Sequence, residues 1–119
     1  LRDPNSPLSK RSIYFDFDSY VVKPEFQSLV QTHGRFLAQN PDLKVLIQGN
    51  ADERGSREYN LALGQKRAEA GKTAPGTCGA REDQVEAVSL GEEKPVCTEK
   101  TEECYAQNRR ADILYSGEF

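Results

Sequence analysis

The chain has 119 residues, which suits one domain with a modest hydrophobic core. Its 16 basic and 19 acidic residues give a net charge of −3, so composition does not favour a nucleic-acid or anionic-membrane surface. The sequence contains no run of 18 apolar residues and does not open with a signal-peptide pattern. These features favour a soluble domain.

The first third of the chain predicts a strand followed by an amphipathic helix. Residues 1–11 are rich in turn formers and are expected to be a flexible tether, with one domain over residues 12–119. Residues 12–18 alternate apolar and polar side chains, which predicts a half-buried strand ending in acid. Residues 24–39 carry apolar side chains at helical spacing. The only histidine, His33, lies on this apolar stripe, where packing is a better explanation than catalysis.

A charged loop bracketed by glycines follows the second predicted strand. Residues 43–48 are an apolar run that predicts a buried strand, and the loop extends from Gly49 to Ser56. Ser56 can cap a helix that begins at Arg57. Such a loop can hold a zwitterion, whose carboxylate faces arginine and backbone N–H groups while its ammonium faces aspartate. The alternative interpretation is a solvated strand-to-helix connection.

The second helix is expected to begin near Ser56. Asn60, Gly64 and Arg67 share one of its faces, and Gly64 would let another backbone approach closely.

The same helix is expected to end early. Its next inward positions hold Gly71 and Pro75, and a proline in a helix interior costs roughly 3 kcal/mol or more. We therefore expect the helix to stop near Ala70 or Gly71, with residues 72–80 as an irregular loop.

Two further strands complete the predicted fold. They cover residues 84–90 and 111–115, and residues 106–110 form either a short helical turn or an extended lead-in. The order of elements predicts an α+β two-layer sandwich, in which a mixed sheet of about four strands carries helices on one face.

Three cysteines leave an odd count. Cys97 and Cys104 lie in one polar loop, where a disulfide is sterically possible if the loop doubles back. Such a bridge would indicate an oxidising compartment, whereas the alternative is two free thiols. Cys78 would be unpaired in either case.

One pair of aspartates in the sequence is a candidate for enzymatic chemistry. Asp16 and Asp18 resemble the aspartate pair of haloacid-dehalogenase-like phosphatases, so a small phosphohydrolase is an alternative function. That family also needs a lysine and a second acidic pair in a larger sheet, for which this chain is short. A zinc site is not expected, because the cysteines lack C-x-x-C spacing, and no cofactor is predicted.

One long stretch is specific enough to indicate a family. Residues 50–68 closely resemble the signature of the peptidoglycan-associated lipoprotein (Pal) group within the OmpA C-terminal-like family. Residues 15–18, 89–95 and 108–111 occur in the family's order and spacing. The resemblance covers roughly residues 12–116 and implies the OmpA-like version of the fold predicted above.

The resemblance implies a site for meso-diaminopimelate, a residue of the peptidoglycan stem peptide that carries both a carboxylate and an ammonium. On the matching positions, Asp52 would pair with the ammonium and the planar fork of Arg67 would hold the carboxylate. Asn60 and Arg109 would shape or line the pocket, and Asp18 would lie at its rim. The pairing of Asp52 with Arg67 comes from the family, not from their spacing.

The chain departs from the family pattern in two places. Ala51 stands where the family commonly has threonine, so one hydroxyl contact is missing. Residues 71–79 replace the second half of an amphipathic helix, and losing its inward aliphatic side chains would cost several kcal/mol. The expected binding residues lie upstream of this segment, and the second departure therefore concerns their support.

The resemblance further implies a non-catalytic protein on the periplasmic side of the outer membrane in a Gram-negative envelope. It would anchor that membrane to the cell wall through an upstream lipid anchor that is absent from this sequence. A partnership with the Tol system and its TolB-like periplasmic propeller protein is also implied, and no nucleic acid is expected. The equivalent domain of an OmpA-type porin or a motor stator is the nearer alternative.

Overall fold

The computed structural model describes residues 5–76 and 79–116. Its elements, in chain order, are η1 (Pro7–Ser9), β1 (Ser12–Tyr14), η2 (Pro24–Phe26), α1 (Gln27–Gln39), β2 (Val45–Asn50), α2 (Arg57–Gly76), η3 (Glu82–Gln84), β3 (Val85–Gly91), α3 (Glu102–Asn108) and β4 (Arg110–Tyr115), where η denotes a 3-10 helix. The expectation for Cys78 lies outside the described residues. Within them, none of the helices is both long and apolar enough to cross a membrane.

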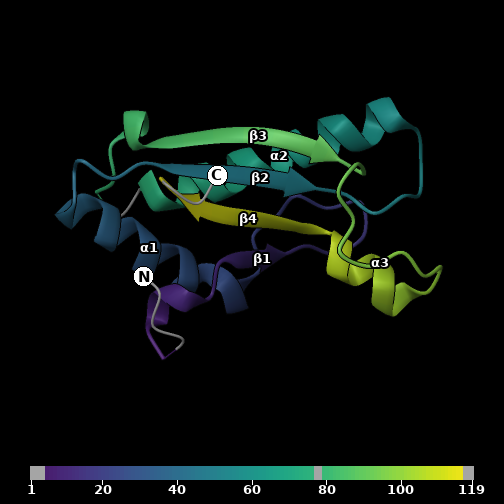
Figure 1. Cartoon of the computed structure of the whole chain (residues 1–119), viewed down its shortest axis with the longest axis horizontal. Coiled ribbons are helices and arrows are strands. Elements are labelled where there is room, and N and C mark those ends of the chain that lie inside the picture. The colour runs from purple at the N-terminus through teal and green to yellow at the C-terminus, as the bar shows by residue number, and fades with distance from the viewer. Residues whose placement is uncertain (1–4, 77–78, 117–119) are drawn as a thin grey trace.

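The four strands form one mixed sheet in the order β1-β4-β2-β3 (Figure 1). β2 and β3 are parallel and are joined through α2, whereas β4 is antiparallel to both β1 and β2. A parallel pair requires such a crossover, because a tight turn cannot connect parallel strands. The predicted α+β architecture, with a mixed sheet of four strands, is confirmed.

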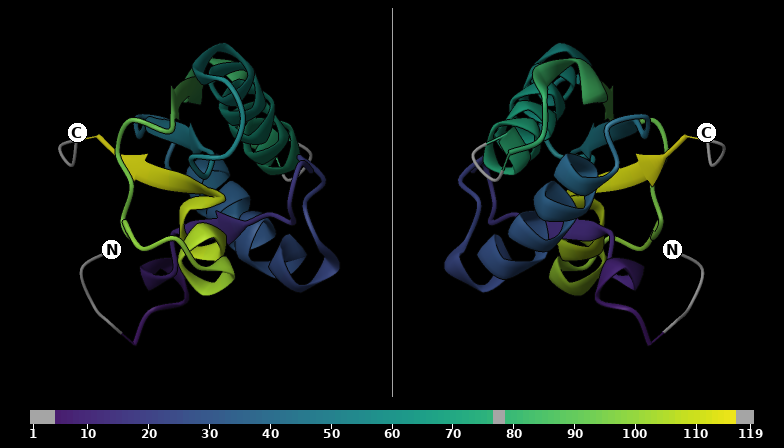
Figure 2. Two further views of the ribbon diagram at one scale, coloured as in Figure 1. Left: turned by 90° about the vertical axis from the view of Figure 1, so that its right-hand side faces the viewer. Right: turned by 90° about the vertical axis from the view of Figure 1, so that its left-hand side faces the viewer.

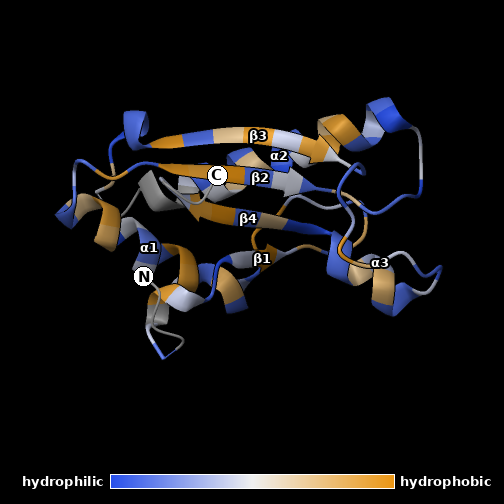
Figure 3. Ribbon diagram, in the orientation of Figure 1, coloured by the Kyte–Doolittle hydropathy of each residue, from blue (hydrophilic) through white to orange (hydrophobic). Residues whose placement is uncertain are grey.

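Helices α1 and α2 lie on the same side of the sheet (Figure 2). Side chains on this face are buried almost completely, for example Ile47, Ile113 and Tyr115 at no more than 1% exposed. Figure 3 shows that β2 and β4 are hydrophobic toward one end and hydrophilic toward the end beside α3. The apolar end holds the core, and the polar end supplies backbone and side chains to the site described below.

The first strand is shorter than predicted. Ile13 and Phe15 are buried as expected, but β1 ends at Tyr14 and Phe17 is 59% exposed. The N–H of Phe15 still donates to the Arg109 carbonyl at 2.9 Å, after which the chain turns and Asp18 adopts a φ of 55°. The prediction that Phe17 belongs to a half-buried strand is therefore wrong.

The prediction that the second helix stops near Ala70 or Gly71 is also wrong, because α2 continues to Gly76. Gly71 is buried, and a methyl group added there would lie 3.3 Å from Cγ2 of Ile47 and 3.6 Å from Cδ1 of Ile13. The two isoleucines fill the space that a larger residue would take, so the glycine leaves no void. A proline one residue from the helix end forgoes one backbone hydrogen bond, which the packing of the helix outweighs.

The polar segment around the cysteines contains a helix, α3, of which only residues 106–108 fall within the predicted helical turn. α3 begins at Glu102, four residues before the predicted helical turn, and Thr101 caps it by accepting the N–H of Cys104 at 3.2 Å. The disulfide between Cys97 and Cys104 is present, with Cα atoms 5.3 Å apart, which confirms that pairing.

The segment before β1 lies against α1. His33 is 1% exposed, and its two ring nitrogens lie 2.6 Å from the Tyr115 hydroxyl and 2.8 Å from the Lys10 carbonyl oxygen. The prediction that His33 serves packing is confirmed. The same contact ties the end of the expected tether to the domain.

Candidate ligand-binding site

A hollow of about 240 Å³ lies at the polar end of the sheet. Three chain segments form its wall: the turn after β1, the loop after β2 and the first turns of α2. Its lining residues are Phe17, Asp18, Ala51, Asp52, Arg54, Gly55, Tyr59, Asn60, Leu63 and Arg67. Four of the five predicted site residues line this hollow, and the fifth, Arg109, lies behind it in ion-pair contact with Asp52.

Arg67 projects from α2 and is completely buried. Its guanidinium donates to three backbone carbonyls: Ser19 at 2.9 Å, Asn50 at 2.9 Å and Asp16 at 3.2 Å. Burial, together with the positive charge of Arg109, lowers the pKa of Arg67 to about 10. No carboxylate of the described residues lies within ion-pair distance of it. A buried cation that is hydrogen-bonded but not neutralised favours an anionic ligand.

Asp52 lies on the loop after β2 and is 5% exposed. Its carboxylate accepts the Arg54 N–H at 2.9 Å and the Arg54 side-chain Nε and Nη2 at 3.1 and 2.8 Å. Burial alone would raise the pKa of the Asp52 carboxyl, but the hydrogen bonds and charge of Arg54 outweigh it and hold the pKa below its ordinary value. Asp52 is therefore an anion at neutral pH and can attract a cation.

Arg109 follows α3 and is 6% exposed. Its Nε donates to the Phe15 carbonyl at 3.0 Å, and its Nη2 donates to Glu102 Oε1 at 2.8 Å. Its Nη1 lies 3.5 Å from Asp52 Oδ2 and makes no hydrogen bond. Arg109 thus shapes the site through Asp52 and does not line the hollow.

The remaining two predicted residues, Asn60 and Asp18, also line the hollow. Asn60 is 1% exposed, and its Nδ2 donates to Glu92 Oε1 at 3.0 Å. Asp18 is exposed at the rim, where its carboxylate accepts the Tyr59 hydroxyl. Ser56 accepts the Tyr59 N–H at 3.0 Å, so the predicted cap of α2 is confirmed and holds this wall in place.

Sequence reasoning gave no specific role to Arg54. Its guanidinium lies 4.3 Å from the ring centre of Phe17 and 4.4 Å from that of Tyr105, between segments far apart in the chain. Cation–π contact with the two rings orients the guanidinium that clamps Asp52. No spacing rule would have joined these three residues, although Arg54 stands within the resemblance motif.

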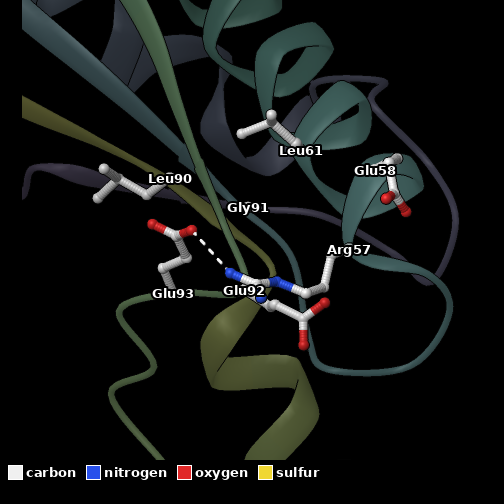
Figure 4. A pocket seen from close by; sticks show the side chains of 7 residues that line it. All are labelled: Arg57, Glu58, Leu61, Leu90, Gly91, Glu92 and Glu93. Atoms are coloured by element: carbon white, nitrogen blue, oxygen red, sulfur yellow. Dashed lines mark hydrogen bonds and ion pairs between the residues drawn. The ribbon is translucent and has the colours of Figure 1, made fainter.

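A second hollow, of about 260 Å³, lies between α2 and the end of β3 (Figure 4). Arg57 and Glu93 form an ion pair across it at 3.3 Å, and both side chains are more than 60% exposed. Leu61, which is 51% exposed, and Leu90 supply its apolar part. It therefore lacks the buried charge that distinguishes the first hollow.

The two aspartates considered for phosphohydrolysis, Asp16 and Asp18, bond to different partners. Asp16 accepts from Lys23 at 3.2 Å, whereas Asp18 accepts from Tyr59. Among residues 5–76 and 79–116, no three acidic, histidine or cysteine side chains are grouped as metal ligands would be. The geometry of the site instead places an anion and a cation, Asp52 and Arg67, in the wall of one hollow.

A sequence model of the OmpA family matches residues 14–109, and the chain belongs to the OmpA family. The chain is similar to the peptidoglycan-associated lipoprotein of Pasteurella multocida, with 44% identity over 87% of this chain and 69% of that protein. The corresponding protein of Haemophilus influenzae is 42% identical over 87% and 68%.

Solved structures agree with this family. The crystal structure of the peptidoglycan-associated lipoprotein from Burkholderia pseudomallei has 59% identity and a TM-score of 0.95, covering 97% of this chain and 98% of that one. The C-terminal domain of Helicobacter pylori MotB has a TM-score of 0.80 over 90% of this chain and 84% of that one, but only 16% identity. The latter likeness shows a common fold alone.

Proposed function

We propose that this chain binds peptidoglycan without catalysis, through the meso-diaminopimelate of the stem peptide. The observation that carries the proposal is the buried guanidinium of Arg67, which lines the same hollow as Asp52 and has no carboxylate partner among the described residues. Diaminopimelate would bring a carboxylate to Arg67 and an ammonium to Asp52. Similarity to proteins named peptidoglycan-associated lipoproteins supports the same ligand.

In this proposal the domain anchors the outer membrane to the cell wall from the periplasmic side, through a lipid anchor upstream of this sequence. It works within the Tol–Pal system, with a TolB-like propeller protein as partner. The high identity to a peptidoglycan-associated lipoprotein favours this role over that of a porin or motor-stator domain. The separate partners of Asp16 and Asp18 give no support to a phosphohydrolase.

Calorimetric titration with two synthetic stem peptides tests the ligand. One peptide ends in meso-diaminopimelate, and the other carries lysine in its place, which keeps the side-chain ammonium and lacks the side-chain carboxylate. We expect the lysine peptide to bind at least about tenfold more weakly, because Arg67 then stays without an anion. Equal binding of the two peptides would overturn the role of Arg67 and with it the proposed recognition of diaminopimelate.

Two isosteric or charge-conserving variants test the protein side. Asp52→Asn should remove the partner of the ligand's ammonium, and Arg67→Lys should lose the planar fork that holds its carboxylate. Each variant is therefore expected to bind the diaminopimelate peptide more than about tenfold more weakly. Asp42→Asn and Arg57→Lys make the same changes at exposed positions outside the hollow. A thermal melt of each variant establishes that it is folded, and equal losses in the controls would contradict the site.

A further inference from the structure

Asp52 shares both of its arginines with a second carboxylate, that of Glu102. Glu102 Oε1 accepts from Arg109 Nη2 at 2.8 Å, and Glu102 Oε2 lies 3.6 Å from Arg54 Nη2. The hydrogen bond from Arg109 also holds the pKa of Glu102 below its ordinary value. The site therefore contains a four-charge cluster, made of Asp52, Glu102, Arg54 and Arg109, in which two positive charges balance two negative ones.

Removing Glu102 would change this cluster in a defined way. Asp52 alone would face two arginines, which leaves a net charge of +1 where an ammonium must bind. Nη2 of Arg109 would also lose its acceptor, and Asp52 is the carboxylate already 3.5 Å from that guanidinium. Arg109 would then be drawn toward Asp52 and compete with a cationic ligand for it.

We propose that Glu102 is a positioning residue of the diaminopimelate site, holding Arg109 and Arg54 so that the Asp52 carboxylate remains available to the ligand's ammonium. This inference rests on the proposed function. Glu102 does not line the hollow and acts through the two arginines.

The disulfide determines where Glu102 lies. Glu102 is the first residue of α3, and the bridge from Cys97 to Cys104 ties that first turn to the loop before it. Asn108 holds the same loop from the other end of α3, accepting the Cys97 N–H at 3.2 Å and donating to the Cys97 carbonyl at 2.8 Å. Glu102 is 62% exposed and has little packing of its own, so its position depends on this cross-linked frame.

The first test compares Glu102→Gln with Glu103→Gln. Glu103 is its neighbour in the same helical turn and is exposed, so the two variants change the net charge of the domain equally. Calorimetric titration with the diaminopimelate peptide should show a loss of roughly three- to tenfold for Glu102→Gln and no measurable change for Glu103→Gln. Glu102→Asp, which keeps the charge, should recover part of the affinity.

A second ligand separates positioning from general damage. The same peptide with an acetylated side-chain amine keeps its carboxylates and has no ammonium, and it should lose little or nothing further in Glu102→Gln. A variant that merely disturbed the fold would weaken both peptides alike.

The disulfide is tested by a double-mutant cycle in a Cys78→Ser background. Replacing Cys97 and Cys104 by serine should weaken binding of the diaminopimelate peptide severalfold. The same replacement should cause little further loss of affinity when Glu102 is already glutamine. Fully additive losses would overturn the link between the bridge and Glu102.

The outcomes distinguish this inference from the proposed function. If Asp52→Asn abolishes binding while Glu102→Gln matches Glu103→Gln, the diaminopimelate site stands and the role of Glu102 is refuted. If the unsubstituted chain does not distinguish the diaminopimelate peptide from the lysine peptide, the proposed function itself fails.

Discussion

Gly49 of β2 and Gly64 of α2 are in direct backbone contact. A methyl group added to Gly64 would lie 2.8 Å from the Gly49 carbonyl oxygen and would clash with the Ser89 hydroxyl. A methyl group added to Gly49 would in turn overlap the carbonyl of Gly64. The expected close approach at Gly64 is therefore observed, and it lets α2 lie near enough to β2 for Arg67 to reach the Asn50 carbonyl.

We predict that Gly64→Ala lowers the free energy of unfolding by roughly 2 to 4 kcal/mol, because the clash is with backbone that cannot move aside. Gly71→Ala is the matched control on the same helix, since the three atoms nearest to its methyl group would be isoleucine side-chain atoms. There the gain in helix propensity, about 1 kcal/mol, offsets tight packing, so we expect a change within about 1 kcal/mol. Urea unfolding measures both variants. A similarly small effect at the two positions would contradict the close backbone contact between Gly49 and Gly64.

The lowered pKa of Asp52 predicts an acid-dependent contribution to stability. A carboxyl whose pKa is depressed by folding stabilises the protein above its ordinary pKa of 3.8, and this contribution is lost as the pH falls through the folded pKa. The difference in unfolding free energy between the unsubstituted chain and Asp52→Asn should thus be constant near neutral pH and shrink below about pH 4. Urea titrations at pH 7 and at several values below 4 would measure this difference. A difference that persists in acid would argue against stabilisation by the ion pairs of Asp52 with Arg54 and Arg109.

His33 predicts a pH dependence in a higher range. Burial lowers the pKa of His33 from 6.5, so the unfolded chain binds a proton more readily than the folded one. Stability from the neutral ring is fully present above pH 6.5 and is lost as the pH falls below it, until the folded pKa is reached. His33→Gln should be less stable at pH 7.5 and show a flatter profile between pH 7.5 and 5, as it removes the only histidine. Parallel pH profiles for the unsubstituted chain and His33→Gln would exclude His33 as the cause of the pH dependence.

The disulfide predicts a stability effect separate from its effect on the ligand. Cys97 and Cys104 are seven positions apart, and closing so short a loop contributes roughly 2 to 3 kcal/mol by the chain-entropy model. Serine at both positions should lower the unfolding free energy by about that amount without reductant. Reductant should lower the stability of the unsubstituted chain to the same level. If reductant also destabilised the serine variant, its effect would not come from this disulfide.

Local pattern sufficed for much of the fold. Alternation, helical spacing and an apolar run located the core residues Ile13, Phe15, Val30 and Ile47, and the cap at Ser56 was visible as a serine before a helix-forming run. Placing Asp52 and Arg67 at one site required the family resemblance, because no helix or strand spacing relates a loop residue to a residue well inside the following helix.

The errors have a common cause, which is tertiary contact. Gly71 and Pro75 oppose a helix by their own propensities, yet α2 passes through both because Ile47 and Ile13 pack against Gly71. Phe17 has the spacing of a strand residue, but its ring lies beside the guanidinium of Arg54 outside the sheet. Neither contact has a signature in the neighbouring sequence.

The order of strands sets when this domain can fold. β4, the last strand in the chain, lies between β1 and β2 and supplies their pairing partners. Until residues 110–115 are available, β1 has no neighbour and the core lacks Ile113 and Tyr115. We therefore expect no stable intermediate from the first hundred residues and a folding rate limited by long-range strand pairing. A chain that emerges gradually from a ribosome or a translocation pore would stay open until its last segment arrived.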